Sequence, residues 1–130
     1  GLTTNMEEVK KICKKNQILL IEDASESIGQ FTSNKQCGSY GDISIMSFYA
    51  NKNISTGEGG MLLTDDINFY EKAKSLRNLC FQKKRRFFHD ELGWNYRMTN
   101  MQAAIGLAQL KKINFFLKKK GKLVKFIINI

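Results

Sequence analysis

The sequence contains no proline, only one histidine and no apolar stretch long enough to cross a membrane. Its three cysteines, Cys13, Cys37 and Cys80, show neither CxxC nor Cys/His spacing. This spacing excludes the common zinc motifs, predicts no metal site and favours reduced thiols in a cytoplasmic protein. No internal repeat or low-complexity linker divides the 130 residues. We therefore expect one compact domain, or part of one.

Acidic residues are absent from two strongly basic runs. Residues 83–86 are four consecutive bases, and residues 111–125 include seven lysines. The rest of the chain has slightly more acids than bases, so the formal charge of +9 belongs to one loop and one tail. Clustered bases can bind nucleic acid by neutralising phosphates. Solvated charge runs are the simpler interpretation, and we expect neither a nucleic-acid nor a membrane partner.

The remaining sequence predicts alternating helices and strands. A capping-box pattern from Thr4 to Glu7 predicts a helix that runs to about Lys15. The apolar run 17–21 predicts a strand covered on both faces. Further predicted elements are a hairpin or loop at 31–37, strands at 43–48 and 60–64, a helix at 67–76 capped by Asp65 or Asp66, a loop at 78–89, and a long helix that a second capping box opens at Thr99. This order is typical of an α/β protein.

Lys52 lies in the glycine-bounded run Ser-Phe-Tyr-Ala-Asn-Lys-Asn-Ile-Ser-Thr-Gly-Glu-Gly-Gly, residues 47–60. Asp23 and Glu26 follow the apolar run 17–21, at the strand end where open α/β sheets place ligands. Pyridoxal 5'-phosphate chemistry needs an amine that forms a Schiff base and an anion that keeps the ring nitrogen protonated. The amine must also be partly desolvated, or lie near other cations, to react at neutral pH. The alternative for any one lysine is a solvated surface position.

Four segments in the same order make the pattern specific. They are Ile-Glu-Asp-Ala-Ser-Glu-Ser-Ile-Gly (21–29), Gly-Ser-Tyr-Gly-Asp (38–42), the Lys52 run, and Glu-Leu-Gly-Trp-Asn-Tyr-Arg-Met-Thr-Asn-Met-Gln-Ala-Ala-Ile-Gly-Leu-Ala-Gln-Leu (91–110). Together they resemble the DegT/DnrJ/EryC1/StrS family of pyridoxal phosphate-dependent nucleotide-sugar aminotransferases. Members of that family are much longer, so we interpret the chain as an internal fragment.

The resemblance implies an α/β fold. Residues 1–110 would be part of the large cofactor-binding domain of a fold-type I aminotransferase, with a mostly parallel sheet flanked by helices. The similarity ends at about Leu110, so residues 111–130 would form a basic helical tail that is truncated or divergent.

The resemblance also implies roles for five residues. Lys52 would be the catalytic Schiff-base lysine, and Asp23 would accept the pyridinium hydrogen bond. Glu26 would lie near the phenolic oxygen and Ser47 would donate to the cofactor phosphate. Asn95 would reach the phosphate bound by the opposite subunit, which implies a homodimer with shared active sites. Without the resemblance, residues 23, 26 and 47 could equally be a capping aspartate, an exposed loop glutamate and a strand-end serine.

The implied activity is the transfer of an amino group from an amino acid, with glutamate as the expected donor, to a nucleotide-linked keto sugar. Dehydratases of this family carry histidine at the lysine position, so Lys52 favours amino transfer. We expect the longer parent protein to be active and the 130-residue chain alone to be inactive, because a misplacement of about one ångström can cost about a hundredfold in rate. Two alternatives stay open: a non-enzymatic nucleic-acid-binding protein and a decayed gene remnant.

Overall fold

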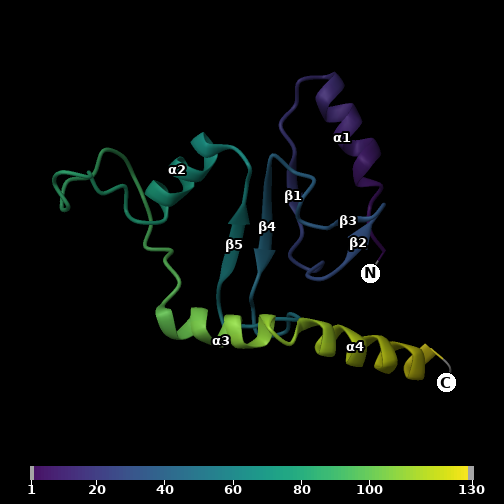
Figure 1. The fold of residues 1–130 in the computed structure, drawn as a ribbon. Coiled ribbons are helices and arrows are strands. Elements are labelled where there is room, and N and C mark those ends of the chain that lie inside the picture. Colours follow the sequence, from purple (N-terminus) through teal and green to yellow (C-terminus); the bar gives the residue numbers. More distant parts are fainter. Residues whose placement is uncertain (1, 129–130) are drawn as a thin grey trace.

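A three-stranded sheet forms the centre of the computed structural model, which describes residues 2–128 (Figure 1). The strands β1 (Ile21–Asp23), β4 (Ile43–Ser47) and β5 (Gly60–Leu63) lie in the order β1-β4-β5. β1 runs parallel to β4, whereas β5 is antiparallel to it. The short strands β2 (Phe31–Thr32) and β3 (Lys35–Gln36) form the predicted hairpin. The predicted α/β class is confirmed, and one of the two strand pairs in this sheet is parallel.

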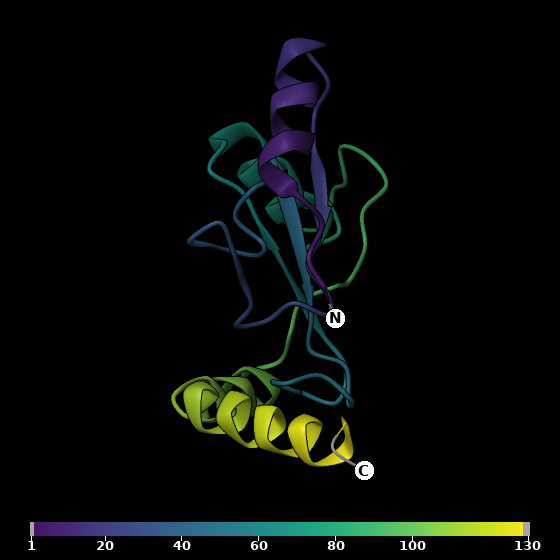
Figure 2. The ribbon, with the colours of Figure 1, turned by 90° about the vertical axis from the view of Figure 1, so that its right-hand side faces the viewer.

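The helices lie at the two ends of the sheet. α1 (Met6–Lys15) lies beside β1, at the end opposite α3 (Asn100–Leu110) and α4 (Ile113–Ile128), as Figures 1 and 2 show. α2 (Ile67–Leu76) follows β5. Within residues 2–128 no helix combines the length and the apolarity needed to span a bilayer.

Two predicted helix starts are confirmed. The Asp66 carboxylate accepts hydrogen bonds from the backbone N–H groups of Asn68, at 2.7 Å, and Phe69, at 3.2 Å. The Thr99 hydroxyl accepts from the Gln102 backbone N–H at 3.2 Å, and the Gln102 side-chain oxygen accepts from the Thr99 backbone N–H at 3.0 Å. Both caps satisfy N–H groups that have no partner inside the helix.

The predicted start of α1 is wrong by one residue. Asn5, not Thr4, is the N-cap, because its side chain accepts from the backbone N–H of Glu8 at 3.3 Å and donates to the Glu8 carboxylate at 3.1 Å. Asparagine caps a helix at least as well as threonine, so the sequence offered two overlapping starts.

The predicted first strand is also displaced. β1 begins at Ile21, because Leu20 pairs instead with Asp42, whose side chain accepts from the Leu20 N–H at 2.8 Å. The strand is not covered on both faces within the described residues, since Ile18, Leu19 and Ile21 are 57%, 66% and 68% exposed.

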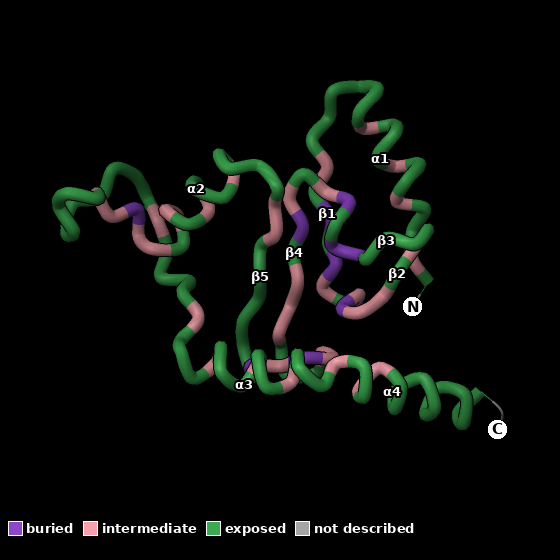
Figure 3. The backbone as a smooth tube through the Cα atoms, in the orientation of Figure 1, coloured by how far each residue is buried: buried purple, intermediate pink, exposed green. Residues whose placement is uncertain are grey.

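The core is small and lies mainly beside β1, as Figure 3 shows. Its buried apolar residues are Ala24, Ile28, Cys37, Tyr40, Ile54 and Cys80. Many large apolar side chains on the strands and helices stay exposed, and polar groups supplement the small apolar core.

The most connected of these polar groups is the buried carboxylate of Glu22 in β1. It accepts hydrogen bonds from the backbone N–H groups of Gly38 at 2.6 Å, Tyr40 at 2.8 Å and Gly41 at 3.2 Å, and from the Ser44 hydroxyl at 3.1 Å. Burial raises the pKa of Glu22, but the four hydrogen bonds outweigh burial and hold the pKa below its ordinary value. The charged form of Glu22 therefore fixes residues 38–44 against β1.

Glu22→Gln should make the free energy of unfolding less sensitive to acidic pH. Because the folded-state pKa of Glu22 is lowered, its contribution is present above the ordinary value of 4.5 and is lost as the pH falls through the folded pKa. At neutral pH the variant should lose about 1–3 kcal/mol of unfolding free energy, because even in its better orientation the amide nitrogen would face the N–H donor of Gly38. Urea unfolding at neutral pH and below pH 4.5 measures both effects.

Glu58→Gln is the matched control, since Glu58 is exposed and its carboxylate makes no hydrogen bond within the described residues. An equal loss of acid sensitivity in both variants would contradict the role given to Glu22.

Candidate active site

The parallel pairing of β1 and β4 brings the carboxyl ends of both strands to one edge of the sheet. Asp23 is the last residue of β1 and Ser47 is the last residue of β4. The loops that follow carry Glu26 and Lys52. The edge outside the carboxyl ends of parallel strands is where α/β proteins bind ligands. Four of the five predicted site residues therefore share one region of the fold.

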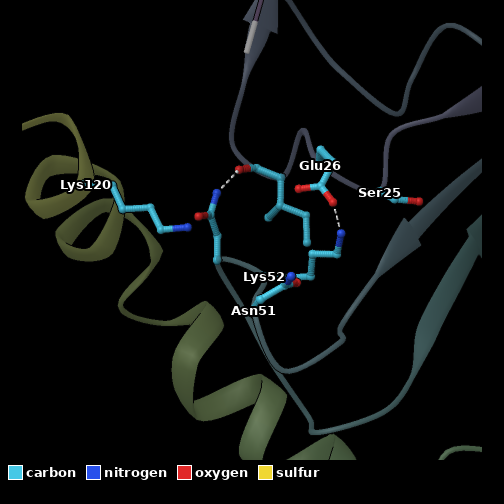
Figure 4. A pocket seen from close by; sticks show the side chains of 7 residues that line it. Ser25, Glu26, Asn51, Lys52 and Lys120 are labelled. Carbon is cyan, nitrogen blue, oxygen red and sulfur yellow. Dashed lines mark hydrogen bonds and ion pairs between the residues drawn. The ribbon is translucent and has the colours of Figure 1, made fainter. Parts of the chain in front are cut away.

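Lys52 lies in a tight turn and is largely shielded from solvent. Its backbone N–H donates to the Tyr49 carbonyl at 3.0 Å. Its side chain is 12% exposed, and its amine forms an ion pair with Glu26, whose side chain is 80% exposed (Figure 4). A lysine amine partly withdrawn from water is the kind that nucleophilic chemistry requires.

The pocket beside Lys52 is small and polar. Its volume is about 50 Å³, and it is lined by Ser25, Glu26, Ile28, Asn51, Lys52, Asn53 and Lys120. The Asn53 side chain donates to the Ile28 carbonyl at 3.0 Å, which ties the two loops together. Pockets that hold small molecules usually measure about 300–1,000 Å³, so these loops enclose room for only a few waters.

Asp23 is held as an anion near Lys52 but outside its pocket. Its carboxylate accepts from the hydroxyl of Ser25 and from the Ser25 backbone N–H, the latter at 3.0 Å. The hydroxyl and then the N–H lower the pKa of Asp23, and the positive charge of Lys52 adds to this effect. Asp23 lines a separate cavity of about 360 Å³ together with Met6 and Cys37. The structure thus places the two residues within electrostatic reach, with no single cavity between them.

Ser47 and Asn95 differ in their relation to this edge. The Ser47 hydroxyl accepts from the Tyr49 backbone N–H at 3.2 Å, so it helps to shape the start of residues 48–59, the loop between β4 and β5 that carries Lys52 (the lysine loop). Asn95 is exposed and forms a backbone bridge with Asn78, in the segment that joins α2 to α3. It does not line the Lys52 pocket.

Two glutamines of α3 hold the lysine loop, and neither is among the residues predicted from the sequence. The Gln109 side chain accepts from the Ser55 N–H at 3.1 Å and donates to the Ser55 carbonyl at 2.6 Å. Gln102 donates to the Glu58 carbonyl at 3.2 Å. Their spacing of seven residues places them on one helix face, and this spacing is the signal that could have found them.

Lys120 of α4 also lines the pocket, although the sequence shows it only as one base in a run. Leu117 packs where a Cβ on Gly29 would lie 2.4 Å from the Leu117 Cδ1 atom, and Gly29 has a φ of +83° that suits glycine. This contact docks α4 on the loop after β1. The two basic runs lie at opposite ends of the molecule (Figure 1), and this separation gives no support to a continuous nucleic-acid surface.

Comparison with protein families gives a match over almost the whole chain. The model of the DegT/DnrJ/EryC1/StrS aminotransferase family matches residues 1–129, so the match continues beyond Leu110. GDP-perosamine synthase of Escherichia coli O157:H7 is 40% identical over 123 residues, which cover 95% of this chain and 34% of that protein. The chain spans about a third of the length of the curated relatives that it matches.

Solved structures give the same result. Helicobacter pylori PseC, an aminotransferase involved in the biosynthesis of pseudoaminic acid, superimposes with a TM-score of 0.82 and 37% identity, covering 87% of this chain and 31% of that one. E. coli GDP-4-keto-6-deoxy-D-mannose-3-dehydratase with bound hydrated PLP gives a TM-score of 0.86 and 29% identity, covering 99% of this chain and 38% of that one. These similarities confirm that the fold is part of an aminotransferase fold.

Gln109→Ala should loosen the lysine loop. The substitution removes both hydrogen bonds to Ser55, so the Ser55 amide should exchange with solvent about tenfold faster, as expected for a loss of about 1.4 kcal/mol of local stability. Amide hydrogen exchange followed by NMR measures this rate. Asn114→Ala is the control, because Asn114 is exposed and its side chain makes no hydrogen bond within the described residues. Unchanged exchange at Ser55 in the Gln109 variant would contradict the role given to Gln109.

Ser25→Ala should raise the pKa of Asp23. The Ser25 hydroxyl is the largest cause of the lowered pKa, so its removal should move the carboxyl towards its ordinary value of 3.8. An NMR titration of the Asp23 carboxyl carbon measures the change. Ser27→Ala should leave the titration as it is, since Ser27 makes no hydrogen bond with the Asp23 carboxylate within the described residues. A titration in the Ser25 variant identical to that of the wild type would refute this cause.

Proposed function

The chain belongs to the DegT/DnrJ/EryC1/StrS aminotransferase family, and from this we propose that the protein transfers an amino group from an amino acid to a nucleotide-linked keto sugar. Its cofactor would be pyridoxal 5'-phosphate. The observation that carries the proposal is the shielded amine of Lys52, which lies in a tight turn beside the carboxyl ends of β1 and β4. The names of the relatives, a perosamine synthase and a sugar-pathway aminotransferase, support the substrate class.

The side chains at this edge fit the cofactor in their chemistry. Lys52 offers a primary amine to the aldehyde, Asp23 an ionised carboxylate to the ring nitrogen, and Ser47 a hydroxyl to the phosphate. Because the pocket beside Lys52 has a volume of only about 50 Å³, binding requires the Glu26–Lys52 ion pair to separate. Glu26 is 80% exposed, so its carboxylate can turn into solvent when the pair separates. Glu26 would then face the phenolic oxygen.

Lys52, Asp23 and Ser47 would each have a separate role in the reaction. When bound, the cofactor withdraws electrons from the substrate carbon that loses a proton. The Nζ atom of Lys52 takes this proton as a general base and returns it as a general acid. Asp23, whose pKa is already lowered, stays ionised and keeps the ring nitrogen protonated. Ser47 would orient the phosphate.

Amino transfer is favoured over dehydration by the residue at position 52. One of the similar structures is named a dehydratase, so the fold alone does not select the reaction. A lysine can bond covalently to the cofactor aldehyde and also move the proton, whereas an imidazole serves only as acid and base.

A homodimer with shared active sites is part of the proposal. Asn95 is exposed and lies outside the pocket of its own subunit, which supports a role at the cofactor phosphate of a partner subunit. Glutamate is the proposed amino donor. A cytoplasmic location agrees with the three free cysteines, Cys13, Cys37 and Cys80.

Borohydride reduction in the presence of pyridoxal 5'-phosphate should attach the cofactor to Lys52. The partly shielded amine of Lys52 lies beside the Glu26 carboxylate, in the loop that follows the proposed phosphate-binding Ser47. It should therefore react in preference to the exposed lysines. Peptide mass mapping locates the label, and Lys52→Ala should lose it. Lys72→Ala is the matched control, because Lys72 is also ion-paired with a glutamate, Glu91, but lies on α2. Labelling spread evenly over the lysines, or retained in the Lys52 variant, would contradict the proposal.

A further inference from the structure

We propose that Lys120 is a second binding residue of the Lys52 pocket and that it holds an oxyanion of the bound ligand. Figure 4 shows the Lys120 side chain extending from α4 towards the pocket that Lys52 and Glu26 line. The two lysines are far apart in the sequence and meet only through the fold.

The position of Lys120 follows from the docking of α4. Leu117 packs against Gly29, in the loop that also carries Glu26. Residues three apart on a helix share one face, so anchoring Leu117 directs Lys120 to the same loop. A side chain at position 29 would displace Leu117, and the absence of a Cβ there is therefore part of what places the second lysine.

The charges of the pocket are unbalanced. Its lining contains two ammonium groups, on Lys52 and Lys120, and one carboxylate, on Glu26. Glu26 pairs with Lys52, whereas Lys120 makes no hydrogen bond or ion pair within residues 2–128. The Asn51 amide and the second N–H of the Asn53 amide add neutral donors to the lining, whereas the Ser25 hydroxyl already donates to Asp23 and the other Asn53 N–H donates to Ile28. A pocket with spare positive charge and hydrogen-bond donors selects an anionic oxygen group.

The ligand chemistry is that of a carboxylate or a phosphate. This inference rests on the proposed function only for the source of that group. An amino-acid donor carries a carboxylate, and the cofactor and a nucleotide-linked sugar carry phosphates. Both are oxyanions that form short, charge-assisted hydrogen bonds with an ammonium group. Lys120 is thus a binding residue, with no part in moving the proton.

The test is a titration of the cofactor-free protein with inorganic phosphate and, separately, with glutarate. NMR shifts of the Asn51 and Asn53 backbone amides report binding at the pocket. We expect saturable shifts with at least one of the two anions, which would enter as the exposed Glu26 carboxylate separates from Lys52. Lys120→Gln should raise the dissociation constant about tenfold, which is the typical loss for one charge-assisted hydrogen bond. Lys120→Arg keeps the charge and should bind within about threefold of the wild type.

Lys118→Gln is the matched control, because it removes the same charge from the same helix at an exposed position outside the pocket. Saturation by phosphate alone assigns the group to a phosphate source, and saturation by glutarate alone assigns it to the donor carboxylate. Binding of neither anion, or an equal loss in the Lys118 and Lys120 variants, would overturn the inference. The titration uses no cofactor, so its result is independent of whether borohydride labels Lys52.

Discussion

The parallel register of β1 and β4 is the constraint on which the candidate site depends. Asp23 pairs with Ile45, so both strands end at the same edge and both following loops leave from it. A slip of one residue would turn every β1 side chain to the other face, which would bury Asp23 and expose Glu22. The buried Glu22 carboxylate resists that slip, because its partners lie on β4, through the Ser44 hydroxyl, and on residues 38–41. The two adjacent acids therefore point to opposite faces of β1. Glu22 is buried and stabilises the sheet, whereas Asp23 is exposed at the edge that carries the candidate site.

The lysine loop is held from both sides, and this explains how a turn can present a shielded amine. Phe48 closes the loop through backbone bonds with Gly59 and Thr56, at 2.9 Å each. On α3, Gln109 hydrogen-bonds to the backbone of Ser55 and Gln102 hydrogen-bonds to the Glu58 carbonyl. Lys52 is therefore positioned by fixed backbone, while its amine is engaged only by the exposed Glu26. Under the proposed function, a loop held by these hydrogen bonds suits a residue that would exchange Glu26 for the cofactor during binding.

The sequence predicted the features that depend on local patterns of residues. The caps at Asp66 and Thr99, the strand positions around 43–47 and 60–63, and the motif around Lys52 all depend on residues close together in the chain. Contacts between distant segments could not be predicted in this way. Ser55 and Gln109 are 54 residues apart, and the approach of Lys120 depends on how Leu117 meets Gly29. The displaced start of β1 has the same origin, since the Asp42 side chain takes the Leu20 N–H from a position that no local pattern around residue 20 reveals.

The central claim is that the amine of Lys52 and the carboxylate of Asp23 act on one cofactor, although the two residues line different cavities. A crystal structure of the protein with pyridoxal 5'-phosphate tests this most directly. We expect the Lys52 Nζ atom to be bonded to the cofactor and the Asp23 carboxylate to accept a hydrogen bond from its ring nitrogen, with Glu26 released from Lys52. A cofactor that is bonded to another lysine, or whose ring nitrogen faces a group other than Asp23, would contradict the account.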